Sequence, residues 1–298
     1  MLNMFASKPH NISEQQCFEA FTPPITVTQP DSYAHGIIFA SPHSGRVYPP
    51  AFTNRTRLPL AALRRNEDAL MDELIAPLSA AGYPTLRAHF PRCYVDVNRA
   101  PDELSPEWVD NTESLTARAK AGLGVIPTAI AEHLPIYKTP LPKTIVTARL
   151  EKLYAPYHNA LQDLMAKAKM RAGLSLLLDC HSMPGTSTSG RQRQDIILGD
   201  RFGASAHPDL VHLVEKIFKA AGYSVTRNYP YAGGHVTSHY GTPDTGSHVI
   251  QIEVNRQIYM NPANFKRTKG FEPLQKCFLH LAKTLHPYVA QDYPRAAE

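Results

Sequence analysis

Metal-binding side chains stand at the ends of three apolar segments that the sequence predicts as strands. The segments are residues 36–40, 174–179 and 248–255. His43 follows the first segment, His181 follows the second, and Glu253 lies in the third. In open α/β sheets, ligands bind beyond the carboxyl ends of the strands. Imidazole nitrogens and carboxylate oxygens are donors that catalytic zinc prefers, so the pattern predicts a metal site.

Two acidic side chains in these segments have more than one interpretation. Asp179 shares a face with His181 if the strand extends that far, so it is either a metal ligand or a partner that orients the histidine. Alternation along the third segment places Gln251, Glu253 and Asn255 on one face. A carboxylate there is costly to bury without a partner. It therefore serves the site, or it belongs to a structural hydrogen-bond network or an edge strand.

A carboxylate ligand is also expected from the segment Asn66-Glu67-Asp68. The spacing of apolar residues predicts one helix from about Leu60 to Ala81, with Asp68 and Asp72 on a similar face. The spacing does not choose between Glu67 and Asp68 as the ligand. A solvated helix face is the alternative for both.

An arginine completes the candidate site. Arg99 follows a further predicted strand, residues 94–98. A guanidinium at this strand end could hold a substrate carboxylate in a bidentate pair. An ordinary ion pair with Asp96 or Asp102 is the alternative.

Other patterns with chemical potential predict no site. His212 and Glu215 are spaced like metal ligands, but the apolar positions of their predicted helix leave both toward solvent. Cys180 alternates with its neighbours and is expected to pack in the core, which argues against a nucleophilic cysteine. The sequence holds no G-x-S-x-G, P-loop or G-x-G-x-x-G pattern. The sequence therefore contains no local motif that would indicate a serine hydrolase, a nucleotide hydrolase or a Rossmann dehydrogenase.

Strands and helices alternate along most of the chain. Predicted helices span residues 60–81, 147–172, 208–221 and 265–285, and predicted strands span residues 36–40, 85–90, 94–98, 174–179, 195–198, 223–227 and 248–255. This rhythm predicts a three-layer α/β fold, with a mixed, mostly parallel sheet covered by helices on both faces. No linker or repeat divides the chain, so a single catalytic domain is expected over residues 1–298, with a core at about 30–290 and a peripheral segment 1–30.

The composition is that of a folded globular protein. The chain has 298 residues, of which 43% are apolar and 19% are charged, which excludes disorder as its main state. The net charge of +5 is spread without blocks of like charge, so nucleic-acid binding is not expected. The four cysteines are far apart, which favours reduced thiols. No membrane-length apolar run and no signal peptide are visible, so we expect a cytoplasmic protein without a membrane partner.

Seven short blocks of the sequence resemble the N-formylglutamate amidohydrolase family. They are residues 41–45 (SPHSG), 66–68 (NED), 94–99 (YVDVNR), 178–184 (LDCHSMP), 197–200 (ILGD), 239–241 (HYG) and 250–256 (IQIEVNR). The resemblance implies a phosphorylase/hydrolase-like α/β/α fold related to zinc carboxypeptidases and aspartoacylases. It also implies hydrolysis of N-formyl-L-glutamate to formate and L-glutamate, a late step of histidine degradation.

The same resemblance implies a metal site and a general base. His43 and His181 match metal ligands, with Asp68 as the carboxylate ligand and Glu67 in reserve. Zn²⁺, or another divalent metal, is the implied cofactor. Glu253 matches the catalytic glutamate of the last strand.

Substrate-binding residues are implied in the same way. Asn98 and Arg99 resemble the pair that grips the substrate carboxylate in aspartoacylase-like relatives. Arg46 stands three residues after His43, where carboxypeptidases have a glutamate, and with His239 it is a further substrate-binding candidate. The expected partner is a small N-acyl amino acid, and the oligomeric state is left open.

These roles predict a hydrolytic mechanism. Zinc lowers the pKa of a bound water toward about 7, and Glu253 acts as general base and then passes the proton to the departing amine. Arg99 or His239 helps the metal to stabilise the tetrahedral oxyanion. The alternatives are a deacylase or carboxypeptidase-like hydrolase of another N-acyl amino acid, and a non-catalytic binding protein with the same fold.

Overall fold

The computed structural model describes residues 9–30, 36–109, 115–130, 134–187 and 189–290. The chain forms two compact units, each assembled from three segments. Unit 1 comprises Met1–Ile25, Gly45–Glu67 and Ala88–Tyr157, and unit 2 comprises Thr26–Ser44, Asp68–Arg87 and His158–Glu298. The single catalytic domain expected over residues 1–298 stays a prediction.

Unit 2 is built on a seven-stranded sheet in the order β1-β3-β2-β6-β9-β7-β8. Its strands are β1 (Ile25–Thr28), β2 (Ile37–Ser41), β3 (Thr85–Ala88), β6 (Ser175–Met183), β7 (Ile196–Gly199), β8 (Val225–Arg227) and β9 (Ser247–Asn255). The run β3-β2-β6-β9 is parallel, as is the pair β7-β8, whereas β7 runs antiparallel to β9. The carboxyl ends of β2, β6 and β9 therefore meet at one edge of the sheet, where a site is expected.

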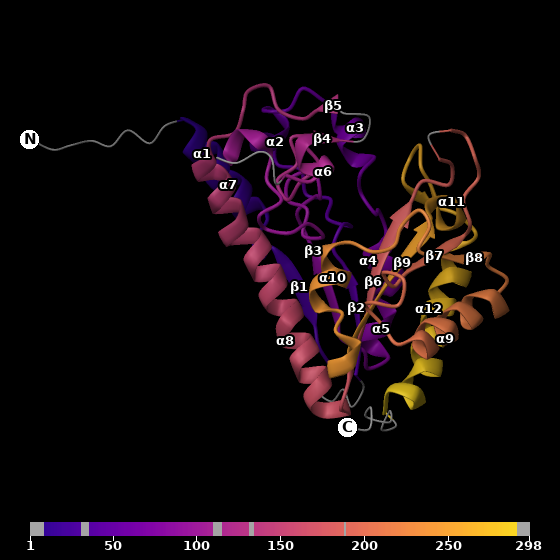
Figure 1. Ribbon diagram of the computed structural model, residues 1–298. Helices are drawn as coiled ribbons and strands as arrows, with labels where there is room; N and C mark the ends of the chain where they lie inside the picture. The colour runs from indigo at the N-terminus through magenta and orange to yellow at the C-terminus, as the bar shows by residue number, and fades with distance from the viewer. Residues whose placement is uncertain (1–8, 31–35, 110–114, 131–133, 188, 291–298) are drawn as a thin grey trace, which may run out of the picture. The chain divides into compact units, whose positions relative to one another are not determined.

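Helices cover both faces of this sheet. They are α4 (Met71–Ile75), α5 (Pro77–Ala80), α8 (Ala155–Ala172), α9 (Pro208–Ala220), α10 (His235–Tyr240), α11 (Arg256–Tyr259) and α12 (Phe271–Ala290), and the smaller elements are η4 (Pro243–Thr245), β10 (Met260–Asn261) and β11 (Lys266–Arg267). One face packs Phe39, Leu178 and Ile252 against α4, α5, α9 and α12 in a continuous apolar core. On the other side of the sheet lie α8 and α10 (Figure 1). The predicted α/β fold with a mostly parallel, mixed sheet is thus confirmed.

Most strand and helix boundaries agree with the sequence. The strand expected over residues 174–179 extends to Met183, because apolar and small residues continue and the parallel pairing with β9 runs over its full length. The last helix begins at Phe271 instead of residue 265. No helix in the described ranges is long and apolar enough to cross a bilayer.

Unit 1 consists of short helices and turns. Its elements are α1 (Pro9–Ala20), α2 (Pro50–Thr53), α3 (Leu60–Arg64), η1 (Pro106–Trp108), α6 (Ala117–Lys120), β4 (Ala129–Ile130), β5 (Leu134–Pro135), α7 (Lys143–Arg149) and the π-helical turn η3 (Leu150–Tyr154). A buried ion pair links its first and last helices, since Arg149 Nε lies 2.6 Å from Glu14 Oε1. The guanidinium also donates to the Tyr137 hydroxyl at 2.7 Å and lies 3.6 Å above the Tyr94 ring. Burial opposes ionisation of Glu14, but Arg149 outweighs it and lowers the pKa of this carboxyl.

The single helix predicted from Leu60 to Ala81 is wrong. Three short helices, α3, α4 and α5, occupy this region, and Asn66, Glu67 and Asp68 lie between the first two. Leu70 adopts a left-handed φ of 64°, which a continuous helix cannot contain. The regular leucine spacing arises because each short helix buries its own leucine, namely Leu63, Leu74 and Leu78. Asp68 and Asp72 therefore do not share the helical face that was expected.

The strand predicted over residues 94–98 is also wrong. These residues form turns, in which the Tyr94 N–H donates to the Pro91 carbonyl at 2.9 Å. The Asp96 carboxylate accepts the backbone N–H of Asn98 at 2.9 Å. Aspartate that bonds a backbone group two residues on favours a turn over an extended strand. The apolar alternation here comes from Val95 and Val97, which are buried in a folded loop.

His248, near the start of β9, is a buried histidine whose ring accepts a backbone hydrogen bond. Its Nδ1 accepts the backbone N–H of His207 at 3.2 Å, so the ring is bound in its neutral form. Burial, followed by the nearby His207 and Lys169, lowers the pKa of His248 from 6.5 to about 4. Between these two values the unfolded chain binds a proton that the folded chain does not, so stability falls as pH falls.

We therefore expect the free energy of unfolding to fall between pH 6.5 and pH 4, with His248 contributing up to about 3 kcal/mol of that loss. Urea unfolding at pH 7.5 and pH 4.5 measures the loss. The matched variant is His248→Asn, whose amide oxygen can accept the same N–H without titrating. An equal loss in this variant would assign the acid sensitivity to other groups.

Candidate metal centre and active site

Three buried side chains from separate parts of unit 2 converge at the carboxyl edge of the sheet. His43 follows β2, Asp68 precedes α4, and His181 lies near the end of β6. Each offers a ligand atom, and these atoms all lie within 4.8 Å of one another. All three residues are at most 2% exposed. The Asp68 N–H donates to the His43 carbonyl at 2.9 Å, so a backbone bond fixes the loop that presents the carboxylate.

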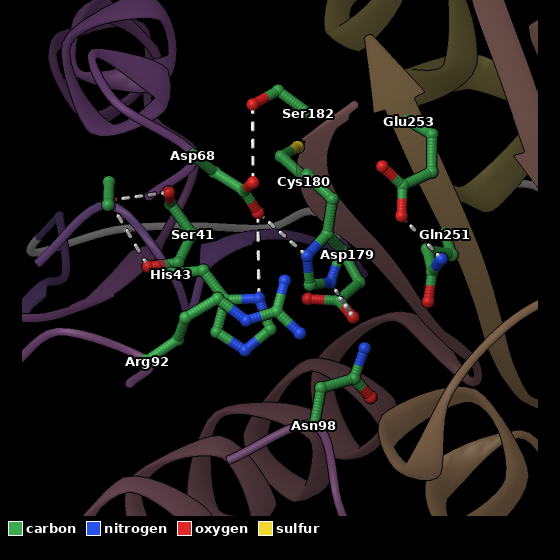
Figure 2. Close-up of polar contacts among 12 residues, drawn as sticks. Ser41, His43, Asp68, Arg92, Asn98, Asp179, Cys180, Ser182, Gln251 and Glu253 are labelled. Carbon is green, nitrogen blue, oxygen red and sulfur yellow. Dashed lines mark hydrogen bonds and ion pairs between the residues drawn. The ribbon is translucent and has the colours of Figure 1, made fainter. Parts of the chain in front are cut away.

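The two histidines face the same oxygen of Asp68. His181 Nδ1 lies 3.1 Å from Asp68 Oδ2, and His43 Nδ1 lies 3.5 Å from the same oxygen. Figure 2 shows the His43 ring facing Asp68. Two imidazoles and one carboxylate match the donor set of catalytic zinc, which keeps a fourth position for water or substrate. The residues present therefore fit a divalent metal ion.

Asp179 lies on the far edge of the His181 ring. Its Oδ2 is 2.9 Å from His181 Nε2, whereas Asp68 meets Nδ1. A carboxylate on the second ring nitrogen fixes the tautomer and orientation of a ligating histidine. Of the two interpretations of Asp179, the geometry favours the orienting partner. Burial alone lowers the pKa of His181, but Asp179 and then Asp68 raise it well above its usual value.

The second oxygen of Asp68 has its own partners. Asp68 Oδ1 accepts the Ser182 hydroxyl at 3.2 Å and Arg256 Nη2 at 3.0 Å. Burial opposes ionisation of Asp68, yet the hydrogen bonds from His181 and His43 hold its pKa well below the usual range, with Arg256 adding to the effect. Sequence reasoning did not identify Ser182 or Arg256. The available signal was the position of Arg256 directly after the strand that carries Glu253.

Glu67 has a different partner from Asp68. Arg64 donates Nε to Glu67 Oε1 at 2.9 Å and Nη2 to Oε2 at 3.2 Å. Both carboxylate oxygens are thus held in a fork-like pair within unit 1. Among the described residues, the group with metal-binding geometry contains Asp68 and not Glu67.

Glu253 is held by a short chain of hydrogen bonds. The backbone N–H of Gly234, at the start of α10, donates to Gln251 Oε1 at 3.0 Å. The amide oxygen is the acceptor there, and Gln251 Nε2 donates to Glu253 Oε1, also at 3.0 Å; Figure 2 shows this contact. The hydrogen-bond network considered as an alternative for this face of β9 is therefore present, and it fixes the orientation of the Glu253 carboxylate. In β9, Glu253 pairs in register with His181 of β6.

Removing the amide of Gln251 tests this orientation. If the protein catalyses the hydrolysis that the family resemblance implies, we expect Gln251→Ala to lower kcat roughly tenfold, because a hydrogen bond to a charged group contributes about 1.5 kcal/mol. Gln275→Ala is the matched control, since Gln275 donates to the Glu73 carbonyl on another part of unit 2. Equal kcat values for the two variants would show that Gln251 does not orient the base.

The remaining predicted site residues are outside the metal-binding group, and their roles stay predictions. His239 is exposed on α10, where its ring stacks on His235 with centroids 5.0 Å apart. Arg46, Asn98 and Arg99 belong to unit 1. Arg99 donates to the carbonyls of Leu123 and Asn98, and its Nε lies 3.9 Å from Asp96. Arg99 therefore forms the ion pair with Asp96 that was considered as an alternative, at a long distance for such a pair.

The patterns set aside from the sequence behave as predicted in most respects. His212 is exposed on α9. Glu215 on the same helix is partly buried and paired with Lys219 and Arg227 instead of with a histidine. Cys180 packs in the apolar core, on the strand face opposite to Asp179.

Comparison with known proteins identifies the family. The family model for N-formylglutamate amidohydrolase matches residues 35–260. The chain belongs to this family. Its fold is similar to the crystal structure of N-formylglutamate amidohydrolase from Ralstonia eutropha JMP134, with a TM-score of 0.81 and 33% identity over 89% of this chain and 98% of that one.

Two further relatives extend the comparison. The N-formylglutamate deformylase of Pseudomonas aeruginosa is 33% identical over 186 residues, which are 60% of this chain and 65% of that protein. The match thus spans just under two thirds of that relative. A gene product of Agrobacterium tumefaciens, Atu2144, shares the fold at 18% identity with a TM-score of 0.58. The predicted resemblance to the amidohydrolase family is confirmed.

Proposed function

We propose that the protein hydrolyses N-formyl-L-glutamate to formate and L-glutamate with the help of a divalent metal, zinc being the best match. The observation that carries this proposal is the buried group of His43, Asp68 and His181 in a member of the N-formylglutamate amidohydrolase family. The names of the relatives from Pseudomonas aeruginosa and Ralstonia eutropha support the choice of substrate.

Each residue has a proposed task in the reaction. His43, Asp68 and His181 hold the metal, which when bound supplies Lewis acidity and lowers the pKa of water to about 7. Glu253 takes a proton from the water whose oxygen attacks the formyl carbon. When the C–N bond breaks, the same carboxyl returns that proton to the departing amine. The amide of Gln251 orients the Glu253 carboxylate through its hydrogen bond.

The substrate-binding assignments rest on the family resemblance. Arg99 and Asn98 are proposed to grip the substrate carboxylate, with Arg46 and His239 as further contacts. A guanidinium suits this task because it presents two parallel N–H groups to a carboxylate. The cytoplasmic location and the place in histidine degradation stay predictions.

A formate-release assay tests the proposal. Protein purified without chelator is analysed for bound metal and assayed with N-formyl-L-glutamate, before and after chelation and again after zinc is restored. About one metal per chain with chelator-sensitive formate release supports the proposal. A panel of N-acetyl, other N-formyl and peptide substrates covers the other N-acyl hydrolases. Tight substrate binding without turnover by the metal-loaded protein would contradict an enzymatic role.

A further inference from the structure

We propose that Arg256 and Ser182 form a clamp that positions Asp68 for metal binding. This inference rests on the proposed metal-dependent function and adds two positioning residues to it. Asp68 is fully buried, and its two oxygens face different groups. Oδ2 faces the two histidines, and Oδ1 faces Ser182 and Arg256.

The clamp is a closed ring of hydrogen bonds. Arg256 Nε donates to the Ser182 hydroxyl at 3.0 Å, and that hydroxyl donates its own proton to Asp68 Oδ1 at 3.2 Å. Arg256 Nη2 donates to the same Oδ1 at 3.0 Å and to the Ser182 carbonyl at 3.2 Å. The serine hydroxyl thus acts as acceptor and donor at once, and the guanidinium fork spans both partners.

The ends of two adjacent strands set the geometry of the clamp. Ser182 is the second-last residue of β6 and directly follows His181. Arg256 follows β9, at a point where the Asn255 side chain accepts the Gln257 N–H and starts α11. Because β6 and β9 pair in register, Ser182 lies opposite Val254, two residues before Arg256. Sheet register therefore determines where the guanidinium lies.

The consequence concerns the metal. With Oδ1 occupied by two donors, Asp68 presents only Oδ2 to the space shared with the histidines, so it acts as a one-oxygen ligand. A carboxylate held in this way loses no rotamer freedom when the ion binds, which favours binding. The positive charge of Arg256 acts in the opposite direction, because it repels a divalent cation. We expect orientation to dominate, since the guanidinium charge is already paired with Asp68.

Zinc affinity measured without substrate tests the clamp. Zinc-free protein is titrated in competition with a chromophoric chelator, for wild type, Arg256→Met, Arg256→Lys and Ser182→Ala. We expect a 10- to 100-fold weaker Kd, about the usual range for lost partners of metal ligands, in Arg256→Met. Arg256→Lys keeps the charge but not the fork and should lie between Arg256→Met and wild type. Ser182→Ala should weaken zinc binding by up to about tenfold.

Arg267→Met is the matched control. It removes an exposed arginine that pairs with Glu73 on the surface of unit 2, so zinc affinity should stay within about twofold of wild type. If Arg256→Met does not fold, Arg256→Lys and Ser182→Ala carry the test, because each leaves a polar or small side chain in place. Circular dichroism and the melting temperature of the zinc-free proteins monitor folding.

The outcomes separate the two proposals. No zinc binding by wild type would overturn the proposed metal-dependent function. Zinc binding by wild type together with unchanged or tighter binding by the folded variants would overturn the clamp alone. A lower melting temperature with an unchanged Kd would reduce both residues to a structural role. At saturating zinc, kcat of the variants should return to within a few-fold of wild type, and a persistent loss of several orders of magnitude would instead place Arg256 on the substrate.

Discussion

Glu253→Gln should abolish most of the formate release while leaving the metal in place. The variant keeps the shape of the side chain but cannot accept a proton, and general base catalysis contributes about 10²- to 10⁴-fold in rate. We therefore expect kcat to fall by that factor. The zinc content should stay at the wild-type value, because Glu253 lies outside the group of His43, Asp68 and His181.

The measurements are kcat for formate release and zinc by elemental analysis on the same sample. Glu215→Gln is the matched control, since Glu215 is a partly buried glutamate of α9 paired with Arg227. Turnover near the wild-type rate in Glu253→Gln would remove Glu253 from the reaction. Loss of zinc would instead indicate that Glu253 contributes to metal binding.

His181→Ala should remove both the metal and the activity. In the proposed metal site the histidine is one of three protein ligands, and its ring is held between Asp68 and Asp179. We expect zinc content to fall to background and kcat/KM to fall by at least about a thousandfold, since metal catalysis contributes several kcal/mol and each 1.36 kcal/mol is tenfold in rate.

A control variant and a folding measurement are needed to interpret the loss of zinc and activity in His181→Ala. His212→Ala removes an exposed histidine of α9 and should retain wild-type zinc and activity. Circular dichroism of His181→Ala checks that β6 still folds. A folded variant that keeps one zinc per chain would show that the ion binds elsewhere. The contrast with Glu253→Gln, which should lose activity without losing zinc, separates metal binding from proton transfer.

The positions of the candidate residues at the strand ends could be predicted from the sequence, whereas their roles stay predictions. His43, His181 and Glu253 were found because parallel strands end at one edge and side chains alternate with a period of two. Both rules are local, and both held in β2, β6 and β9. The sequence left two interpretations of Asp179, a metal ligand or a partner that orients His181. The structure favours the second, because the Asp179 carboxylate contacts His181 Nε2 while Asp68 contacts Nδ1.

The rest depended on long-range contacts. Asp68 was named from a helix that does not exist, and its position comes from the backbone bond to His43 and the left-handed Leu70. Arg256 was not identified, because its partner Asp68 lies 188 residues away along the chain. No periodicity encodes such a pair. In the same way, residue spacing did not distinguish Glu67 from Asp68, whereas the structure places Asp68 beside the two histidines and pairs Glu67 with Arg64.

The wide spacing of the metal-binding group has a consequence during protein synthesis. His181 and Asp68 are 113 residues apart in the chain. A nascent chain that has not yet exposed β6 therefore lacks a complete ligand set, however much of its amino-terminal part has left the ribosome. Since β6 is paired along its whole length by β9, the strand reaches its final position only after Asn255, the last residue of β9, has emerged. Metal binding by this group is thus expected only after β9 has been synthesised and has paired with β6, and metal shortage in a cell would leave metal-free protein in which both strands are already present.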